Sequence, residues 1–443
     1  MTIPSRKVAV LGLDGVPFTL LKRLFASGIM PNLADIAWRG AFLQMDSTLP
    51  AVSSVAWTSF MTGENPGRHG IFGFTDLKPG ALELHLPSFD DIRCRAIWQD
   101  FPEKKHVVVN LPFTYPAREI NGVLISGFVA PVLERSVYPT DLVSWLRSRN
   151  YRIDVDAVRG RRNRKGLIED LFETLQVREE VIFALMESLP WDLFIGVITG
   201  TDRLHHFFFD ALYDPEHPFH EDCITYYRRL DQFVGRFTER LAGRTQLFVL
   251  SDHGFTSLRR QVYVNHILHV AGYLSFVRPN PQSIGDVAPS SLALAMDPTR
   301  IYLNTRDRFK GGLLLHRDAV EVRERLKSDL ENVRLKDVGI GGDKGEEDAD
   351  KKLFKAILTR EELYGEDCVE SAPDLVIIPT PGYDPKASIA APGASSKDIF
   401  TGMHTHDDAF LLGNDPALAH RLARPQIGDV AGLIRENLKA IEL

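Results

Sequence analysis

The chain has 443 residues, of which 44% are hydrophobic and 25% are charged, the proportions of an ordinary globular protein. This length exceeds what one hydrophobic core usually serves, so it predicts a large α/β domain with insertions, or two domains. The net charge of −7 gives no electrostatic basis for nucleic acid or an anionic membrane as the main partner.

The cysteines and the apolar segments indicate the compartment. Cys94, Cys223 and Cys368 are far apart and form no CxxC pair, which is typical of free thiols in a reducing environment. The first residues enter a strand pattern almost at once and leave no room for a signal peptide. No apolar run reaches the ~20 residues that span a bilayer. We therefore expect a cytoplasmic, soluble, enzyme-sized protein.

The first predicted element is a strand over residues 7–13, a nearly continuous apolar run of the kind that is buried on both faces of a parallel sheet. It ends at Asp14-Gly15, and a helical pattern follows over residues 17–26. Ligands of open α/β sheets bind beyond the carboxyl ends of the strands, so Asp14 is a candidate functional residue. The alternative is that Asp14 only caps the following helix.

After a short helix predicted over residues 31–40, the stretch 49–74 is the one around which the chain is organised. Its two serines, Ser53 and Ser54, begin a small apolar run that ends at Gly63, which predicts a helix of about ten residues. A serine hydroxyl at a helix start lies beside unpaired backbone N–H groups and the positive end of the helix dipole. That environment suits a phosphate or sulfate ester. A plain N-cap role for the serine is the alternative.

The middle of the chain continues the α/β pattern. Strands are predicted over residues 106–111, 123–126, 192–198 and 245–250, and helices over 167–188 and 223–241. The basic run over residues 158–166 predicts an exposed loop. Such a charge run is usually solvated, although close to a pocket it could meet an anionic substrate.

Acidic and histidine side chains follow two of these strands. Asp202 and His206 are four residues apart, so on a helix they would share one face and could bind one metal ion. Asp252 and His253 come directly after a strand and could reach one metal ion or two. Chance spacing for the first pair and a hydrogen-bonded turn for the second are the alternatives.

The last third of the chain carries one more group of this kind. Strands are predicted over residues 300–304, 374–378 and 409–412, helical segments over 318–333 and 416–438, and loops over 338–352 and 382–398. His404 lies shortly before the last of these strands, within Gly402-Met403-His404. No internal repeat is visible.

Most of these candidate residues lie at or just after strand ends, and a parallel sheet brings such points together along one edge. The set is Asp14, Ser53, Asp202, His206, Asp252, His253 and His404. Three Asp and three His side chains can hold two divalent ions, and mixed N/O donors favour Zn²⁺, with Mn²⁺ as the alternative. A serine between two such ions indicates phosphoryl transfer.

These stretches, in this order, resemble the alkaline phosphatase superfamily and most closely its type I phosphodiesterase/nucleotide pyrophosphatase branch. The matching pieces are Asp14-Gly15, Ser53 before Thr62-Gly63, Pro66-x-x-His69-Gly70-Ile71, Asp202-x-x-x-His206, Ser251-Asp252-His253-Gly254 and Gly402-x-His404. The resemblance implies an α/β fold with a central, mostly parallel sheet and helices on both faces. It also implies one catalytic domain over residues 1–443, with cap or insert segments around 78–190 and 257–398.

The resemblance implies roles for single residues. One metal would be held by Asp202, His206 and His404, the other by Asp14, Asp252 and His253, with Ser53 as the bridging nucleophile. Nucleotide pyrophosphatases have an asparagine that holds a phosphate oxygen where this chain has Phe72-Gly73-Phe74, so the oxyanion donor and a nucleotide preference stay open. The distance to Thr62-Gly63 favours Ser53 over Ser54. His205 and His406 adjoin ligand positions and have either substrate-binding or structural roles.

The function that follows is a metal-dependent hydrolase that cleaves phosphate diesters or pyrophosphates through a covalent phospho-Ser53 intermediate. A phosphomonoesterase or phosphomutase of the same superfamily is the alternative, followed by an inactive metal-binding regulatory module. No Cys/Ser-x-Pro-x-Arg run follows Ser53 or Cys94, which argues against a sulfatase. The expected partner is a small-molecule phosphate ester, with no nucleic acid polymer and no membrane.

Overall fold

The computed structural model describes residues 2–3, 6–340, 349–391, 393–439 and 441–442. The chain divides into two compact units: unit 1 draws on residues 1–64, 88–256 and 399–443, and unit 2 on residues 65–87 and 257–398. Residues 341–348 of the loop predicted over 338–352 lie outside the described residues. Among the described helices, none is both long enough and apolar enough to cross a membrane.

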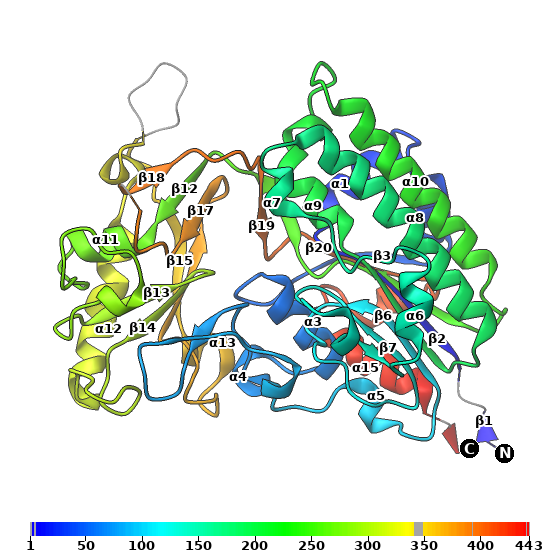
Figure 1. The fold of residues 1–443 in the computed structure, drawn as a ribbon, viewed down its shortest axis with the longest axis horizontal. Coiled ribbons are helices and arrows are strands. Elements are labelled where there is room, and N and C mark those ends of the chain that lie inside the picture. Colours follow the sequence, from blue (N-terminus) through cyan, green and yellow to red (C-terminus); the bar gives the residue numbers. More distant parts are fainter. Residues whose placement is uncertain (1, 4–5, 341–348, 392, 440, 443) are drawn as a thin grey trace. The chain divides into compact units, whose positions relative to one another are not determined.

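Unit 1 is built on an eight-stranded sheet in the order β3-β20-β10-β2-β9-β6-β7-β8 (Figure 1). The five strands from β10 to β7 are parallel, while β3, β20 and β8 pair antiparallel with their neighbours. This arrangement confirms the predicted mostly parallel sheet. The strands of unit 1 are β1 (Thr2–Ile3), β2 (Val8–Leu13), β3 (Ala41–Met45), β6 (His106–Leu111), β7 (Gly122–Ser126), β8 (Val137–Tyr138), β9 (Leu193–Ile198), β10 (Gln246–Leu250), β19 (Gly402–Thr405), β20 (Ala409–Gly413) and β21 (Ile441–Glu442).

Helices cover both faces of this sheet, with α8 and α10 on one side and α3 and α15 on the other (Figure 1). The helices of unit 1 are α1 (Phe18–Ala26), α2 (Pro31–Arg39), α3 (Ser53–Thr62), α5 (Ile97–Asp100), α6 (Leu142–Arg147), α7 (Ala157–Gly160), α8 (Arg164–Ser188), α9 (Gly200–Phe208), α10 (His220–Glu239), α14 (Leu418–Arg421) and α15 (Asp429–Leu438).

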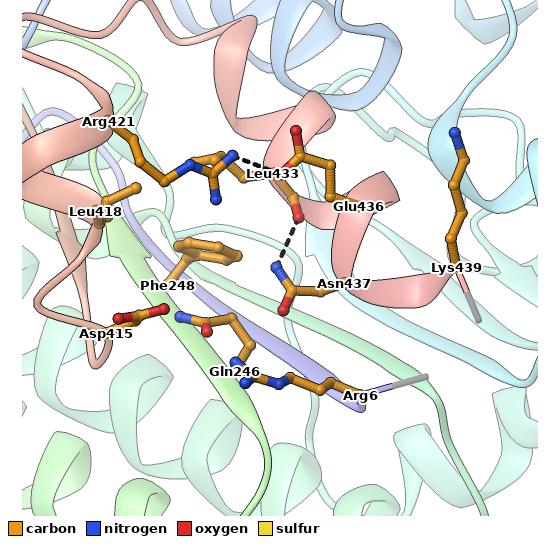
Figure 2. Close-up of a pocket in the computed structure, with 10 residues that line it drawn as sticks. All are labelled: Arg6, Gln246, Phe248, Asp415, Leu418, Arg421, Leu433, Glu436, Asn437 and Lys439. Atoms are coloured by element: carbon orange, nitrogen blue, oxygen red, sulfur yellow. Dashed lines mark hydrogen bonds and ion pairs between the residues drawn. The ribbon is translucent and has the colours of Figure 1, made fainter. Parts of the chain in front are cut away.

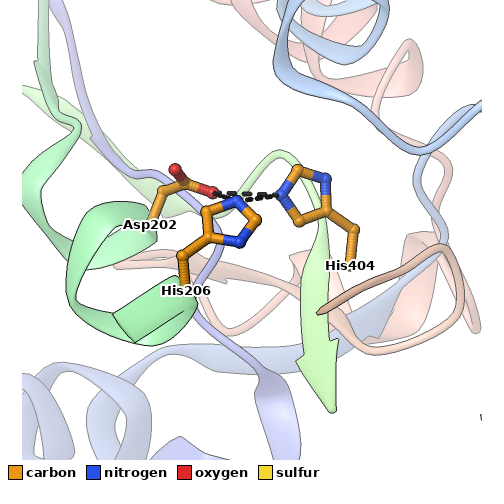
Figure 3. Close-up of side chains that lie close together, drawn as sticks. All are labelled: Asp202, His206 and His404. Atoms are coloured by element: carbon orange, nitrogen blue, oxygen red, sulfur yellow. Dashed lines mark hydrogen bonds and ion pairs between the residues drawn. The ribbon is translucent and has the colours of Figure 1, made fainter. Parts of the chain in front are cut away.

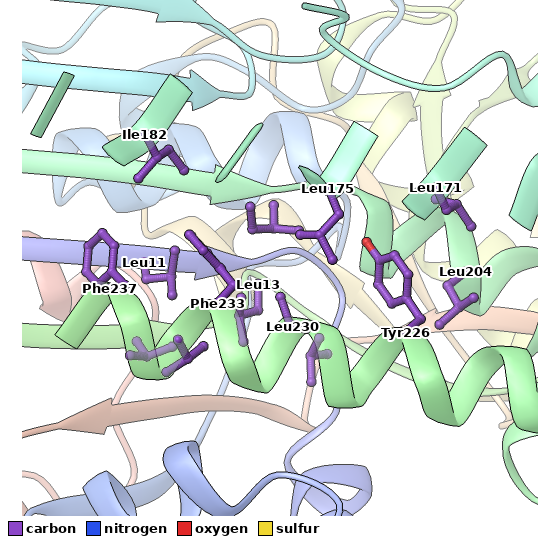
Figure 4. Packing of buried hydrophobic residues seen from close by; sticks show 14 of the residues in the cluster. Leu11, Leu13, Leu171, Leu175, Ile182, Leu204, Tyr226, Leu230, Phe233 and Phe237 are labelled. Atoms are coloured by element: carbon purple, nitrogen blue, oxygen red, sulfur yellow. The ribbon is translucent and has the colours of Figure 1, made fainter. Parts of the chain in front are cut away.

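Strand β2 shows why the first predicted strand is apolar on both sides. Leu11 and Leu13 point toward one face and pack in one cluster with Leu175 of α8 and Phe233 of α10 (Figure 4). On the opposite face, a Cβ added at Gly12 would approach the ring of Trp57 on α3 to 2.5 Å. Only glycine therefore allows α3 to lie so close to the strand. All six residues of β2 are buried, as the apolar run predicts.

Unit 2 has its own core and a different architecture. Its main sheet has four antiparallel strands in the order β13-β14-β16-β15, and the buried side of α12 joins the same hydrophobic cluster. The elements that lie in unit 2 are β4 (Asp76–Leu77), β5 (Leu84–His85), β12 (Arg260–Tyr263), β13 (Ala293–Met296), β14 (Arg300–Leu303), β15 (Phe354–Thr359), β16 (Leu375–Pro379), β17 (Tyr383–Lys386), β18 (Ser395–Ser396), α4 (Pro66–His69), α11 (Val264–Val270), α12 (His316–Asn332) and α13 (Arg360–Tyr364). Strand β11 (Gly254–Ser257) ends at the boundary between the two units.

Two sequence predictions of loops are wrong. The basic run over residues 158–166 contains the end of α7 and the start of α8, because the side chains of Asp156 and Asn163 cap these helices by accepting hydrogen bonds from the backbone N–H groups of Arg159 and Gly166. The stretch 382–398 contains β17 and β18, which pair with the two edges of β12. Pairing with a strand more than 100 residues away is not visible in a local pattern.

Candidate active site

The sheet of unit 1 brings all seven candidate residues to one edge. Five adjacent strands supply them, in the order β3-β20-β10-β2-β9. Because β20 runs antiparallel to β10, its start lies at the same edge as the carboxyl ends of the parallel strands. Ser53 follows β3, His404 precedes β20, Asp252 and His253 follow β10, Asp14 follows β2, and Asp202 and His206 follow β9.

The first of two side-chain groups, here named the outer group, consists of Asp202, His206 and His404 (Figure 3). Strand β9 leads into α9, which places Asp202 in its first turn and His206 one turn later on the same face. His404 comes from β19. Its Nε2 lies 3.2 Å from Oδ1 of Asp202 and 3.0 Å from Nε2 of His206, and the remaining pair of atoms is 3.4 Å apart.

Hydrogen bonding prepares the outer group to bind a cation. Nδ1 of His404 lies 3.0 Å from the carbonyl oxygen of Ala51, so Nδ1 carries the proton and Nε2 presents its lone pair to the group. Burial alone would raise the pKa of Asp202, but the charges of His206 and Arg203 outweigh it and hold this pKa well below its ordinary value. A carboxylate oxygen and two ring nitrogens that converge in this way are a suitable donor set for Zn²⁺ or Mn²⁺.

The second group, here named the inner group, consists of Asp14, Asp252 and His253, whose donor atoms all lie within 4.8 Å of one another. Nε2 of His253 is 3.4 Å from Oδ2 of Asp252 and 3.8 Å from Oδ1 of Asp14. The rings of His253 and His404 stack with their centroids 3.8 Å apart, so the inner and outer groups are neighbours.

Each inner ligand is oriented by a hydrogen bond on its far side. Oδ2 of Asp14 accepts from Nε1 of Trp57 at 3.0 Å, and Oδ1 of Asp252 accepts from the N–H of Gly15 at 3.0 Å. Nδ1 of His253 lies 3.2 Å from the carbonyl oxygen of Gly254, which leaves Nε2 as an electron-pair donor. Oδ2 of Asp252 is buried and accepts no hydrogen bond. Buried carboxylate oxygens are normally satisfied, so this donor set fits a divalent cation.

The electrostatics of the inner group favour a cation as well. Burial, followed by the charges of Asp252 and Asp202, raises the pKa of Asp14 well above its ordinary value. Burial and the charge of Asp202, against the hydrogen bond from Gly15, raise the pKa of Asp252 to about 7. Burial and then His404 lower the pKa of His253 well below its ordinary value. A divalent cation between these side chains removes the repulsion between the carboxylates and stabilises their charged forms.

Ser53 faces the inner group. Its Oγ lies 3.3 Å from Oδ1 of Asp14 and 3.3 Å from Nε2 of His253. The N-cap of α3 is Val52, without a side-chain cap, so the serine does not act as a plain N-cap. The helix itself covers Ser53–Thr62 and ends at Gly63 with φ of 75°, in agreement with the predicted ten residues. Oγ of Ser54 is buried and makes no hydrogen bond, so only Ser53 presents its hydroxyl to the candidate ligands.

For His205 the sequence left open a substrate-binding or a structural role. In the structure both of its ring nitrogens make hydrogen bonds. Nδ1 contacts the carbonyl oxygen of Gly15 at 2.9 Å and Nε2 contacts the hydroxyl of Tyr227 at 2.6 Å. Burial lowers its pKa to about 4, so the ring is neutral at pH 7. It therefore holds α9 against the turn that follows β2 and has no nitrogen left for a substrate. His406 is partly exposed, and its carbonyl oxygen accepts from the N–H of Ser47.

Sequence reasoning missed three residues that support the ligands. Trp57 bonds to Asp14, while Arg203 bonds to both Asp202 and Asp154. The only sequence signals were that Arg203 adjoins a ligand and that Trp57 lies one helical turn after Ser53. The pocket of Figure 2 is not part of this site, because it lies at Gln246, the start of β10, whereas the ligands follow the other end of that strand.

The mostly parallel sheet and the residues at its edge are those that the resemblance to the alkaline phosphatase superfamily implies. Within that class, the family model described as type I phosphodiesterase / nucleotide pyrophosphatase matches residues 8–407, and the chain belongs to this family. This family consists of hydrolases, in agreement with the sequence prediction of a phosphohydrolase. A comparison with curated proteins returns no match.

Solved structures share the fold over nearly the whole chain. Phosphonoacetate hydrolase from Sinorhizobium meliloti 1021, in complex with phosphonoacetate, is similar with a TM-score of 0.65 and 16% identity over 98% of this chain and 96% of that one. Murine ectonucleotide pyrophosphatase/phosphodiesterase 5, an inactive variant in complex with AMP, gives 0.56 and 14% over 99% and 96%. The human protein of the same name gives 0.56 and 12% over the same shares.

Proposed function

We propose that the protein is a two-metal phosphohydrolase that cleaves phosphate diesters or pyrophosphates through a phospho-Ser53 intermediate. The observation that carries this proposal is the place of the Ser53 hydroxyl, 3.3 Å from two inner-group donor atoms. The stacked rings of His253 and His404 put the outer group beside them. Family membership supports the reaction class.

The residues have separate tasks in this reaction. Asp14, Asp252 and His253 hold one ion, and Asp202, His206 and His404 hold the other. Bound divalent ions lower the pKa of the serine hydroxyl and of water and neutralise charge on the phosphoryl group. Ser53 Oγ loses its proton and forms a bond to phosphorus, while the bond from phosphorus to the leaving oxygen breaks and that oxygen takes up a proton. Water then attacks the phosphoserine and restores the Ser53 hydroxyl.

Zinc is the first choice for both positions, because each set mixes histidine nitrogen with carboxylate oxygen. Manganese is the alternative, since it accepts the same donors with a greater preference for oxygen. The ordered hydrogen bonds behind His404 and His253 support nitrogen coordination through Nε2 in each group.

The substrate class is a small-molecule phosphate ester. The similar structures contain AMP in one case and phosphonoacetate in the other, which supports a small anionic substrate without choosing between them. Cleavage of a phosphate monoester, or phosphomutase chemistry, is the second candidate because the same donor sets serve it. Three statements stay predictions. The first is one catalytic domain over residues 1–443, the second is selection of the substrate by residues around 78–190 and 257–398, and the third is the cytoplasmic location.

The decisive experiment is a comparison of hydrolysis rates for bis-(para-nitrophenyl) phosphate and para-nitrophenyl phosphate on zinc-loaded protein. A diester rate well above the monoester rate is the expected result, and the reverse would move the protein to the monoesterase side. Acid quenching during turnover, followed by peptide mass spectrometry, should find phosphate on Ser53. Turnover of neither ester after loading with zinc and with manganese would contradict the proposed activity.

A further inference from the structure

Arg203 is the residue next to an outer-group ligand, and its side chain is only 14% exposed. Its Nη1 donates to Oδ2 of Asp202 at 2.9 Å. Its Nε and Nη2 donate to Oδ2 of Asp154 at 2.9 and 2.6 Å. The guanidinium also lies over the ring of Phe128, 4.3 Å from its centroid. One largely buried cation thus joins Asp202, a candidate metal ligand, to Asp154, a carboxylate 48 residues away from it in sequence.

This contact divides the two oxygens of Asp202 between different partners. Oδ2 is taken by Arg203, while Oδ1 is the atom that faces His206 and His404 at 3.4 and 3.2 Å. The terminal torsion of an aspartate is broad and roughly two-fold, so the side chain alone does not choose which oxygen faces the histidines. The charged guanidinium of Arg203 binds Oδ2 and so fixes this torsion, which leaves only Oδ1 to bind the cation.

Asp154 gives Arg203 an anchor outside α9. Its Oδ1 accepts from the N–H of Val155 at 2.9 Å, so the carboxylate is itself oriented. A second buried arginine, Arg178 of α8, holds the same segment by donating to the carbonyl oxygens of Arg152 and Ile153 at 2.9 and 2.8 Å. Within the described residues, the hydrogen bonds of Arg178 go to Tyr151, Arg152 and Ile153 and to no member of either metal-ligand group, which makes it the matched control for Arg203.

We propose, on the basis of the two-ion function above, that Arg203 held by Asp154 is a positioning residue for the outer group. It presents Asp202 as a one-oxygen ligand and thereby sets the affinity of the outer cation position. The inner group depends on it much less, because Trp57, Gly15 and Gly254 orient those ligands and Arg203 acts on Asp14 only through its charge. Residues that orient metal ligands typically change metal affinity by about 10- to 100-fold when they are replaced.

The test is a zinc titration of the metal-free, full-length protein against a chromogenic competing chelator. The unaltered protein is expected to bind two ions. In Arg203→Met one affinity should fall about 10- to 100-fold while the other changes much less, and Asp154→Asn should weaken the same position to a smaller extent. Arg203→Lys keeps the charge but lacks the planar fork that donates to Asp202 and Asp154 in fixed directions, so it should restore only part of the affinity.

Two further measurements separate positioning from general support. Arg178→Met removes a more deeply buried arginine that holds the segment around Asp154 from α8, so it should lower thermal stability and leave both zinc affinities unchanged. With Co²⁺ in place of zinc, the visible absorption of the outer position should change in Arg203→Met and not in Arg178→Met.

The outcomes are distinguishable from failure of the proposed function. Fewer than two zinc ions on the unaltered protein would contradict the two-ion function itself. Two ions on the unaltered protein, with unchanged affinities in Arg203→Met, would overturn the role of Arg203 alone. A fall in zinc affinity of the outer position in Arg178→Met that equals the fall in Arg203→Met would also overturn the role of Arg203. If Arg203→Met fails to fold, Arg203→Lys and Asp154→Asn carry the same comparison.

Discussion

The inner and outer groups contain the same kinds of ligand but differ in how the fold holds them. In the inner group the side chains of Asp14 and His253 are 3% and 0% exposed, whereas in the outer group His206 and His404 are 25% and 20% exposed. The inner ligands directly follow two adjacent parallel strands, β2 and β10. The outer ligands come from α9 and from β19, which pairs with β11 outside the main sheet.

Because of this difference, we expect the ion of the inner group to be tightly held and linked to folding, and the ion of the outer group to exchange with solvent. Two buried carboxylates whose pKa values are raised are costly to keep ionised together without a cation, so an ion in the inner group should contribute directly to the free energy of unfolding. The outer group reaches solvent and relies on Arg203 for its geometry. We expect the inner ion to be structural as well as catalytic and the outer ion to exchange more readily.

The largest expected effect is that of Ser53→Ala. Removing the hydroxyl that faces the inner group should lower turnover by about 10⁴-fold or more, ~5.5 kcal/mol in the barrier, because no nucleophile remains. Zinc content should stay at two ions, since each group keeps its three Asp and His ligands. Ser54→Ala is the matched control, because its Oγ makes no hydrogen bond, and it should keep most of the activity. Equal activity of the two variants would remove Ser53 from the mechanism.

The second prediction compares one ligand from each group. Asp252→Asn should abolish tight zinc binding in the inner group and most of the zinc-dependent rise in melting temperature. His404→Gln should leave one tight ion and most of that rise. An ion at 1,000 times its dissociation constant stabilises the folded state by about 4 kcal/mol, so the difference is measurable by thermal denaturation with and without zinc. Equal losses in both variants would show that the two positions do not differ in their link to folding.

The residues of the two groups could be predicted from the sequence, because a parallel sheet brings the ends of its strands together. Asp14 and Asp252 directly follow apolar runs, and adjacent parallel strands bring such residues to one edge. The preference for Ser53 over Ser54 came from the spacing to the end of the helix. In the structure Oγ of Ser53 lies 3.3 Å from Oδ1 of Asp14, and its role as the nucleophile stays a prediction.

The supporting contacts could not be predicted, because they join residues that are distant in sequence and leave no local pattern. Asp154 meets Arg203 across 49 positions, and Trp57 meets Asp14 across 43. The same holds for unit 2, in which the segment 65–87 joins residues 257–398. Which nitrogen of His404 is protonated depends on one backbone carbonyl, that of Ala51, and sequence cannot supply it.

The third prediction concerns the inner group alone. Trp57→Phe removes the hydrogen bond to Oδ2 of Asp14, and a hydrogen bond to a charged group contributes about 1.5–3 kcal/mol. Zinc affinity of the inner position and kcat/KM should each fall about tenfold, with the outer affinity unchanged. Phe60→Leu is the control, because this ring packs against Trp57 with centroids 5.4 Å apart and does not contact Asp14. A similar loss in Phe60→Leu would assign the effect to packing.

The smallest expected effect belongs to the open side of the outer group. The guanidinium of Arg161 lies over the ring of Phe400 at 4.6 Å, and that ring lies 5.5 Å from the ring of His206. The positive charge of the basic run therefore lies one aromatic ring away from a candidate ligand, on the side that solvent reaches. Partly solvated charges interact weakly, typically by less than about 1 kcal/mol.

Arg161→Gln should accordingly raise KM by about two- to fivefold for diesters that carry a second anionic group, with kcat unchanged. KM for diesters with neutral substituents should not change, and the increase for the anionic substrates should disappear at high salt because the charges are screened. Arg39→Gln, which removes an exposed arginine paired with Asp35 on α2, is the charge-matched control. Equal changes in KM for neutral and anionic diesters would mean that Arg161 acts through packing on Phe400. In that case its charge does not attract substrate to the open side of the outer group.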